Sequence, residues 1–345
     1  MTLNIYPKLA PMPGFTGMGG GPTGLGLAGG GPQLIPFYGD RGVYFGAFYE
    51  SGNTRTWNHI DYSNITSGSN GQDFGDLTTD KQNPGSGWSN ESRLCSPGGY
   101  QYEHSNTHIY LDEIDYVAAA TTGNASDFGD LTNNGGAGGA NAGNDRGLRC
   151  AGNNGSGNTN VIDYVTVSTT GNATDFGDLT QSVSSCSVQS NGYRMVRAMG
   201  HDGGYNNNTM DYVTIDTPGN AADFGDSTLG RHSHAGASSD LDSGSDRGVN
   251  YHGIAAGSHN NTIDYVTIST TGNASDFGDG TAAYTDLGGT SDNSRGVILG
   301  GGTGAYTTAY DYIRQITIDT AGNASNLATL SGGRRGPGAA SGSSS

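Results

Sequence analysis

Apolar and polar residues alternate over short stretches of this chain, and similar stretches return at intervals. Residues 261–268 read Asn-Thr-Ile-Asp-Tyr-Val-Thr-Ile, in which apolar and polar side chains largely alternate. A period of two residues is the signature of a half-buried β-strand. Because no stretch carries an amphipathic helical period of useful length, the pattern predicts an all-β protein made of short strands.

The alternating stretch belongs to a unit of about fifty residues that occurs six times. Each copy carries an Asp-Tyr pair, at steps of 54, 48, 48, 53 and 47 residues, and five copies add Asp-Phe-Gly-Asp. An arginine, usually followed by glycine and an apolar residue, recurs at steps of 52, 53, 48, 53 and 48 residues. The last copy is irregular, with three extra residues after Tyr312 and no Asp-Phe-Gly-Asp. The repeated arginines are Arg41, Arg93, Arg146, Arg194, Arg247 and Arg295, and the repeated aspartates are Asp61, Asp115, Asp163, Asp211, Asp264 and Asp311.

Each unit contains material for three or four short strands joined by turns such as Thr-Thr-Gly-Asn, whose Gly and Asn tolerate left-handed backbone. Units of ~40 to 50 residues with this content are typical of propeller blades. We therefore predict a six-bladed β-propeller over residues 36–331, preceded by a Pro/Gly-rich arm (1–35) and followed by a Gly/Ser-rich tail (332–345). The alternative is an open β-solenoid, whose coils normally need only ~20 to 30 residues.

The end of the chain leaves the closure of the ring open. Arg334-Arg335-Gly336 resembles the start of a seventh unit. The C-terminal tail therefore either completes the first blade or only repeats the motif.

Composition narrows the class of partner. Hydrophobic residues make up only 32% of the 345 residues, and glycine supplies 62, which suits a ring of thin sheets better than one deep core. The net charge of −17 makes nucleic acid a poor partner, because phosphate binding needs clustered positive charge. No segment has the ~20 apolar residues of a membrane helix. No secretory signal precedes the repeats, so we expect synthesis in a cytoplasm without export.

The repeated arginines and aspartates occur once per unit, which predicts that they meet. A guanidinium matches a carboxylate or backbone carbonyl groups. An arginine of one blade that reached an aspartate, or carbonyls, of the next would fix the register of the ring. We predict such contacts as a structural device, with separations within ~4 Å for the ion-pair version.

The Asp-Phe-Gly-Asp motif resembles the metal-binding motif of kinases, but it occurs five times without a phosphate loop or catalytic loop. We expect the phenylalanine to pack between blades and the aspartates to cap turns. The alternative is calcium binding by the paired aspartates, although the twelve-residue calcium loop is absent. The calcium candidates are Asp127, Asp130, Asp175 and Asp178; otherwise we expect no cofactor.

The remaining chemistry points to binding rather than to catalysis. Cys95, Cys150 and Cys186 have no metal-type spacing and are expected to be buried thiols. The His232-Ser233-His234 stretch reads as a solvated loop, and no unique carboxylate pair or Ser-His-Asp order is present. We therefore expect no enzyme activity.

The loops vary between units, and several carry tyrosine and asparagine, which suit sugar recognition and adaptable protein contacts. Solvated loop tips are the alternative interpretation. The candidate ligand-loop residues are Tyr100, Tyr102, Tyr193, Tyr205, Tyr251, Tyr284 and Tyr306.

The run 263–279, Ile-Asp-Tyr-Val-Thr-Ile-Ser-Thr-Thr-Gly-Asn-Ala-Ser-Asp-Phe-Gly-Asp, follows an Asp-Arg-Gly-Val marker. Together they resemble the kelch-like repeats in virion structural proteins of marine tailed phages, including those of cyanobacteria. The resemblance covers roughly residues 36–331 and departs at Ser63-Asn64 and in the sixth unit. It implies no catalytic residues.

The resemblance implies a virion protein that displays the propeller and is held to other virion proteins by residues 1–35. The favoured role is a tail-associated adhesin that attaches the virion to a host surface glycan or receptor. A capsid decoration protein is the alternative within the virion. A glycan-degrading depolymerase and a surface lectin are the alternatives from other classes.

Overall fold

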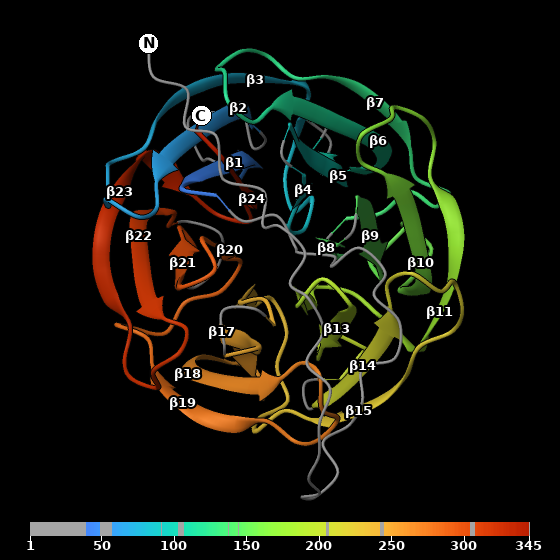
Figure 1. Cartoon of the computed structure of the whole chain (residues 1–345), viewed down its shortest axis with the longest axis vertical. Helices are drawn as coiled ribbons and strands as arrows, with labels where there is room; N and C mark the ends of the chain where they lie inside the picture. Colours follow the sequence, from blue (N-terminus) through green and yellow to red (C-terminus); the bar gives the residue numbers. More distant parts are fainter. Residues whose placement is uncertain are drawn as a thin grey trace, which may run out of the picture. The chain divides into compact units, whose positions relative to one another are not determined.

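The computed structural model describes residues 39–48, 57–90, 92–102, 107–136, 138–143, 145–204, 207–241, 245–303 and 308–344. The prediction of an all-β, six-bladed β-propeller is confirmed, and the solenoid alternative is wrong (Figure 1). The expected arm, residues 1–35, lies outside the described residues. In the described part of the chain, no helix has the length and apolar character needed to cross a membrane.

Every blade is a four-stranded antiparallel sheet, written here from the axis outward. Blade 1 contains β24 (Gly338–Gly342), β1 (Arg41–Ala47), β2 (Trp57–Asn64) and β3 (Gln72–Lys81). Blade 2 contains β4 (Trp88–Ser89), β5 (Arg93–Tyr102), β6 (His108–Ala118) and β7 (Ser126–Asp130). Blade 3 contains β8 (Gly139–Gly143), β9 (Arg146–Cys150), β10 (Thr159–Thr166) and β11 (Thr174–Val183).

The second half of the ring follows the same order. Blade 4 contains β12 (Ser187–Ser190), β13 (Arg194–Ala198), β14 (Thr209–Thr214) and β15 (Ala222–Asp226). Blade 5 contains β16 (Ala235–Ser238), β17 (Arg247–Ala255), β18 (Ser258–Thr267) and β19 (Ser275–Asp279). Blade 6 contains β20 (Gly288–Ser291), β21 (Arg295–Leu299), β22 (Tyr310–Thr317) and β23 (Ser325–Arg334).

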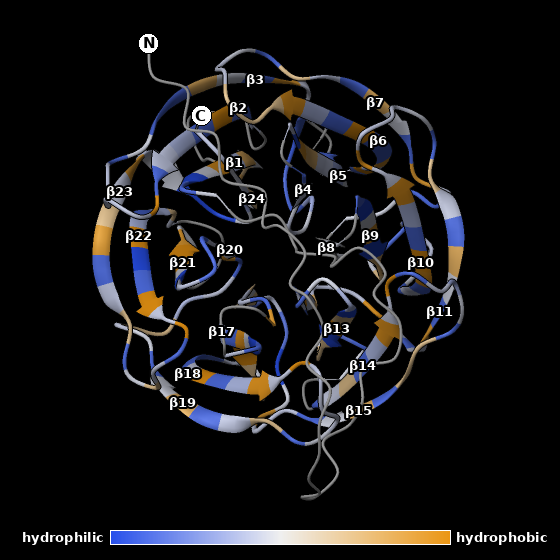
Figure 2. Cartoon of the chain, in the orientation of Figure 1, coloured by the Kyte–Doolittle hydropathy of each residue, from blue (hydrophilic) through white to orange (hydrophobic). Residues whose placement is uncertain are grey.

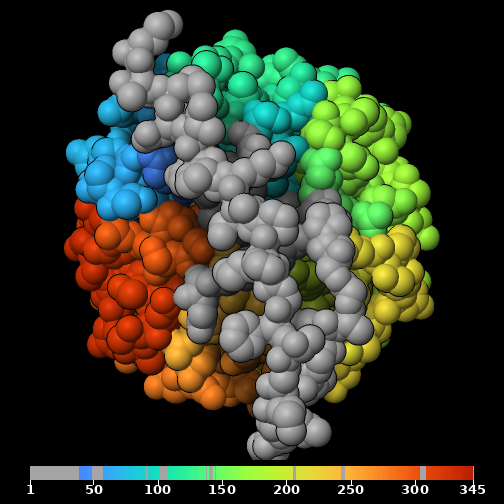
Figure 3. All heavy atoms as spheres, in the orientation of Figure 1, coloured from blue at the N-terminus to red at the C-terminus, as the bar shows by residue number. Residues whose placement is uncertain are grey.

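The C-terminal segment closes the ring, because β24 pairs with β1 as the inner strand of blade 1. Asp40 also accepts hydrogen bonds from the backbone N (3.0 Å) and side chain (2.8 Å) of Ser344. The propeller thus extends beyond the boundary expected at residue 331, and the tail completes the first blade. In the space-filling view the blades follow one another around the ring in chain order (Figure 3).

Small side chains fill the centre because six inner strands converge there. β16, β20 and β24 read AGAS, GGTS and GAASG. A Cβ on Gly289 would lie 2.5 Å from the carbonyl oxygen of Gly236 in the neighbouring inner strand. A larger residue at this position would therefore push the inner strands apart.

The apolar core lies between blades rather than inside one of them. Phe74 of the first Asp-Phe-Gly-Asp copy packs with Leu94 and Val117 of blade 2. Its ring also meets Tyr62 of its own blade edge-on, with centroids 5.8 Å apart. The predicted packing of this phenylalanine between blades is confirmed, and Figure 2 shows the hydrophobic positions interleaved with hydrophilic ones along the third strands.

In blades 2 to 6, the turn that ends in Gly-Asn docks on the Asp-Phe-Gly-Asp segment of the preceding blade. Gly171 N donates to Phe128 O (2.7 Å), and Asp130 N donates to Asn172 Oδ1 (3.2 Å). Gly129, at φ 144°, has no room for a side chain, since a Cβ would lie 2.5 Å from Gly171. The backbone of the motif is therefore hydrogen-bonded to the next blade.

The repeated arginines contribute a second joint. Among the described residues, none of the six lies within 4.0 Å of a carboxylate, so the ion-pair version of the prediction is wrong. The carbonyl version is what the structure shows: each Nη1 donates to a backbone oxygen of the next blade at 2.6–3.4 Å. In five blades the guanidinium also lies 4.4–4.9 Å from the ring of the Asp-Tyr tyrosine.

The two ends of the blades differ. Because neighbouring strands are antiparallel, the loops between second and third strands share one end with the connections from each blade to the next. We call this end the cavity face, because residues of the connections between blades line a small cavity there. The opposite end, the turn face, carries the Thr-Thr-Gly-Asn turns and both ends of the described ring, Gly39 and Ser344.

Candidate functional site

A small cavity lies on the propeller axis at the cavity face, with a volume of about 50 Å³. At ~10–15 Å³ per water, it has room for a few water molecules rather than for a sugar ring. Backbone hydrogen bonds of 2.8–3.0 Å join its rim across blades 4, 5, 6, 1 and 2, through Ser185, Ser233, Asp286, Gly336 and Asn83. Each blade supplies one residue just before its inner strand: Pro337, Gly85, Gly138, Cys186, His234 and Leu287.

The charged and titratable side chains at this cavity are paired or buried. Asp286 accepts from Nε of Arg335 at 2.7 Å. Burial holds the pKa of His234 well below its ordinary value, and repulsion from Arg231 and His232 adds to the effect. The prediction that His232-Ser233-His234 is a solvated loop is wrong for His234, which is buried. At this cavity, His234 is therefore neutral at pH 7, and Asp286 is paired with Arg335.

Aromatic side chains gather at the cavity-face ends of three consecutive blades. In blade 6, Tyr310 and Tyr312 stack with centroids 5.6 Å apart, and Trp57 and His59 stack at 4.8 Å at the equivalent positions of blade 1. Blade 2 adds a cluster with centroids 4.9–6.1 Å apart. We name this set the aromatic arc: Trp57, His59, Tyr100, His108, Tyr110, Tyr310 and Tyr312.

The arc is partly open to solvent. Tyr312 is 37% exposed, and His108 of the blade 2 cluster is also exposed. The residues that replace the blade 1 and blade 6 pairs in blades 3, 4 and 5 are mostly Thr and Asn: Thr159, Val161, Asn207, Thr209, Asn260 and Thr262. At these two strand positions, blades 6 and 1 therefore carry aromatic side chains, whereas blades 3, 4 and 5 carry mostly amides and hydroxyls.

The predicted ligand-loop tyrosines divide into several groups. Tyr100 lies in β5 and belongs to the aromatic arc, whereas Tyr193 lies in a turn on the opposite face and is 37% exposed. Tyr251 is fully buried in β17, and Tyr284 is buried under Arg314, so the prediction is wrong for both. Tyr205 and Tyr306 lie outside the described residues, as does the side chain of Tyr102.

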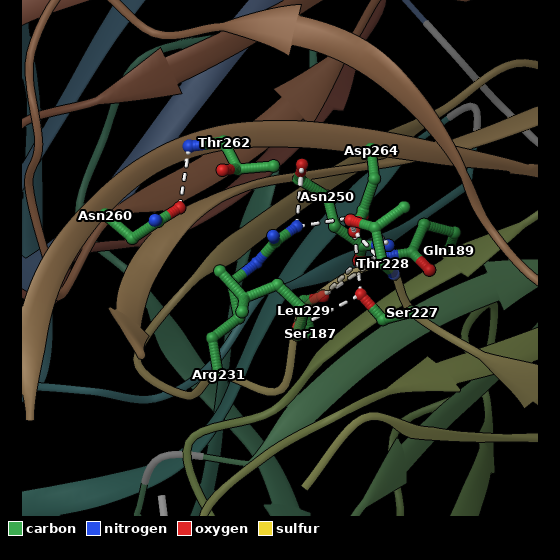
Figure 4. Close-up of polar contacts among 10 residues, drawn as sticks. All are labelled: Ser187, Gln189, Ser227, Thr228, Leu229, Arg231, Asn250, Asn260, Thr262 and Asp264. Carbon is green, nitrogen blue, oxygen red and sulfur yellow. Dashed lines mark hydrogen bonds and ion pairs between the residues drawn. The ribbon is translucent and has the colours of Figure 1, made fainter. Parts of the chain in front are cut away.

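Beneath the cavity face lies a layer of buried charge formed by the Asp-Tyr aspartates. In blade 5, Asp264 accepts from Arg231 (2.8 Å) and from the hydroxyls of Ser227 and Thr228 (2.7 Å each). Figure 4 shows these three side chains pointing toward the carboxylate from the end of the preceding blade. Asn250 joins it to Gln189 of blade 4. The network is a joint between blades.

The cation of each joint comes from one of two positions. Lys81 and Arg334, at the ends of β3 and β23, and Arg231, in the segment after β15, reach the aspartates of the following blades at 2.6–2.9 Å. Blades 2 and 3 carry Gly135 and Val183 there instead. The aspartates that follow them face arginines directly across the sheet in their own blades, Arg149 opposite Asp163 and Arg197 opposite Asp211.

Blade 6 reverses the sign of this layer. The residue opposite Ile298, at the position of the aspartate in the other blades, is Arg314 and not Asp311. The three extra residues precede the strand position, so the prediction of Asp311 as the sixth repeated aspartate is wrong. Arg314 is fully buried and lies 4.0 Å from the ring centroid of Tyr284.

The calcium candidates lie on outer strands. Asp127 and Asp130 are exposed at the ends of β7, and Asp127 caps the nearby backbone through Gly129 N at 3.0 Å. Asp175 and Asp178 occupy the same positions in blade 3. Within the described ranges, no group of three or more His, Cys, Asp or Glu residues is arranged to hold a metal ion.

All three cysteines are buried, as predicted. Burial raises the pKa of the Cys95 thiol. Cys186 lines the axial cavity, and Cys150 and Cys186 share the core between blades 3 and 4.

No family model matches this chain, and no curated protein matches it in sequence.

Proposed function

We propose that this protein is a virion structural protein that binds a host surface glycan through the aromatic arc. The observation that supports it most is the gathering of partly exposed aromatic rings on one face of adjacent blades. Aromatic faces pack against the C–H faces of sugar rings, and neighbouring amides and hydroxyls fix orientation. The net charge of −17 favours a neutral glycan over an anionic one.

The position of the chain ends supports an orientation in which the aromatic arc faces away from the particle. Gly39 and Ser344 both lie on the turn face, where Asp40 and Ser344 are hydrogen-bonded. Residues 1–35, attached at that end, are proposed to anchor the protein to other virion proteins. The aromatic arc then points away from the particle, as a tail-associated adhesin requires.

Two tyrosines of equal exposure provide a matched test. Tyr312 belongs to the arc and Tyr193 lies on the turn face, and both are 37% exposed. The assay is binding of the purified full-length protein to immobilised host-surface glycans. Tyr312→Ala is expected to weaken binding about tenfold, as for loss of one aromatic contact of ~1–1.5 kcal/mol. Tyr193→Ala should bind like the wild type.

Equal binding by both variants would contradict a role for the arc. If neither folded variant bound glycan, the site would not be confined to the cavity face, and this result would also contradict the proposal. Release of reducing ends during the same incubation would replace the adhesin with a depolymerase. A protein located on the capsid, with no glycan binding, would support the decoration alternative.

A further inference from the structure

Two of the three cysteines form a pair between blades 3 and 4. Cys150 ends β9 of blade 3, and Cys186 lies directly before β12 of blade 4. Both are buried in the apolar core that these blades share, and their thiols are hydrogen-bonded to each other. Cys95, in blade 2, makes its side-chain hydrogen bond with Trp88 instead. Of the three cysteines, Cys150 and Cys186 therefore have the sulfur-to-sulfur contact from which a disulfide can form.

The hydrogen bond gives the two sulfur atoms different roles. Cys150 donates its S–H to the sulfur of Cys186, which also accepts from Gly139 N–H. The bond from Cys150 lowers the pKa of the Cys186 thiol, and Arg197 and Gly139 add to this effect while burial opposes it. The same bond, together with burial, raises the pKa of Cys150. Because the thiolate is the nucleophilic form of cysteine, Cys186 is the attacking sulfur of the pair and Cys150 retains its proton.

Cys186 is also the member of the pair that a small molecule can reach. It lines the axial cavity at the cavity face, whereas Cys150 is fully buried. The cavity volume of about 50 Å³ gives room for a few water molecules. Hydrogen peroxide is little larger than water, whereas a peptide disulfide such as glutathione disulfide is far too large for this space. The cavity therefore favours a small peroxide as the oxidant.

We propose that Cys186 is a site of oxidation by hydrogen peroxide and that Cys150 converts the product into a disulfide between blades 3 and 4. In the first step, the Cys186 thiolate attacks one peroxide oxygen, so that an S–O bond forms and the O–O bond breaks. The departing hydroxide takes up the proton that Cys186 released and leaves as water, and Cys186 becomes a sulfenic acid. This inference is independent of the proposed glycan binding.

In the second step, Cys150 loses its proton and its sulfur attacks the sulfur of Cys186. An S–S bond forms, the S–O bond breaks, and the departing hydroxide takes up the Cys150 proton and leaves as a second water. Two thiols are thereby oxidised by two electrons, and one peroxide is reduced to two waters. The disulfide closes a loop between two blades and therefore stabilises the ring.

The test is oxidation of the purified full chain with hydrogen peroxide, followed by digestion without reducing agent and mass spectrometry. We expect the peptides of Cys150 and Cys186 to be joined by a disulfide, with Cys95 still a thiol. The unfolding equilibrium constant in urea should fall about a hundredfold on oxidation and recover after treatment with dithiothreitol. Retention of all three thiols, a disulfide that includes Cys95, or coincident unfolding curves would overturn the proposal.

Single serine variants separate the two roles. With one equivalent of peroxide, Cys150→Ser should stop at a sulfenic acid on Cys186, whereas Cys186→Ser should leave Cys150 unoxidised. Cys95→Ser is the matched control and should form the disulfide like the wild type. Oxidation of Cys150 in the Cys186→Ser variant would contradict the assigned roles. The wild-type test decides the question if a variant fails to fold. Glutathione disulfide should leave the folded wild type unmodified, and a mixed disulfide on Cys186 would contradict access through the cavity.

Discussion

The two sources of buried cation should be interchangeable within one blade joint. Lys81 Nζ lies 2.6 Å from Asp115 and 3.2 Å from the backbone oxygen of Ser96. Lys81→Val leaves the carboxylate buried without its cation and should cost about 3–5 kcal/mol. Ser96 faces Asp115 across the sheet as Arg197 faces Asp211. An arginine at position 96 therefore starts from the place that supplies the cation in blade 4.

Ser96→Arg alone crowds a second cation against Lys81 and should cost about 1–3 kcal/mol. The double variant Lys81→Val/Ser96→Arg reproduces the Val183 and Arg197 arrangement and should recover at least half of the summed loss. Urea unfolding of the four proteins at pH 7 gives the coupling energy as a double-mutant cycle. The reverse exchange in blade 4, Arg197→Ser with Val183→Lys, is the matched control. Losses that simply add in both blades would refute the idea that the two positions serve one carboxylate.

Gly280, His252 and β24 each offer a separate test. Gly280→Leu should destabilise the fold by about 1–3 kcal/mol through overpacking, since a Cβ there lies 1.7 Å from His252 Nε2. Adding His252→Gly should restore much of the melting temperature, because blades 1 and 2 pair Leu77 with Gly46 and Leu131 with Gly98 at the same positions. A double variant with a melting temperature no higher than that of the single variant would contradict this. Burial lowers the pKa of His252 to about 3, so below about pH 6.5 the unfolded chain binds a proton that the folded chain does not. The contribution of His252 to stability should therefore be complete above pH 6.5 and fall by up to about 1.4 kcal/mol per pH unit toward pH 3. Urea unfolding of His252→Gln should show a smaller loss of stability with falling pH, and an unchanged loss would mean that other groups cause it. Truncation after Pro337 removes β24 and should raise amide exchange throughout β1 above that of β13; equal protection would mean that the ring closes without it.

The sequence predicts the ring well because every blade repeats two landmarks. The partners of these landmarks are harder to predict, because the repeat count does not say which positions face each other. The buried cations come from two positions, represented by Lys81 and Arg197, and no single spacing covers both. Arg314 was obscured by Asp311-Tyr312, which copies the motif three residues too early.

The aromatic arc could not be predicted from the sequence for a different reason. Tyr310 and Trp57 come from opposite ends of the chain, and only the closure by β24 makes blades 6 and 1 neighbours. The closing strand itself, Gly-Ala-Ala-Ser-Gly, has little strand propensity. It is a strand because it pairs with β1 along its whole length.

In the proposed orientation, the turn face is attached to the virion and the cavity face is presented to a host. A cryo-electron microscopy reconstruction of the virion bound to its host surface tests it most directly. We expect a six-bladed ring on the particle, with Gly39 and Ser344 toward the virion and the aromatic arc, including Tyr312, against the host surface. A ring whose cavity face is buried against other virion proteins, or a particle without the ring, would contradict it.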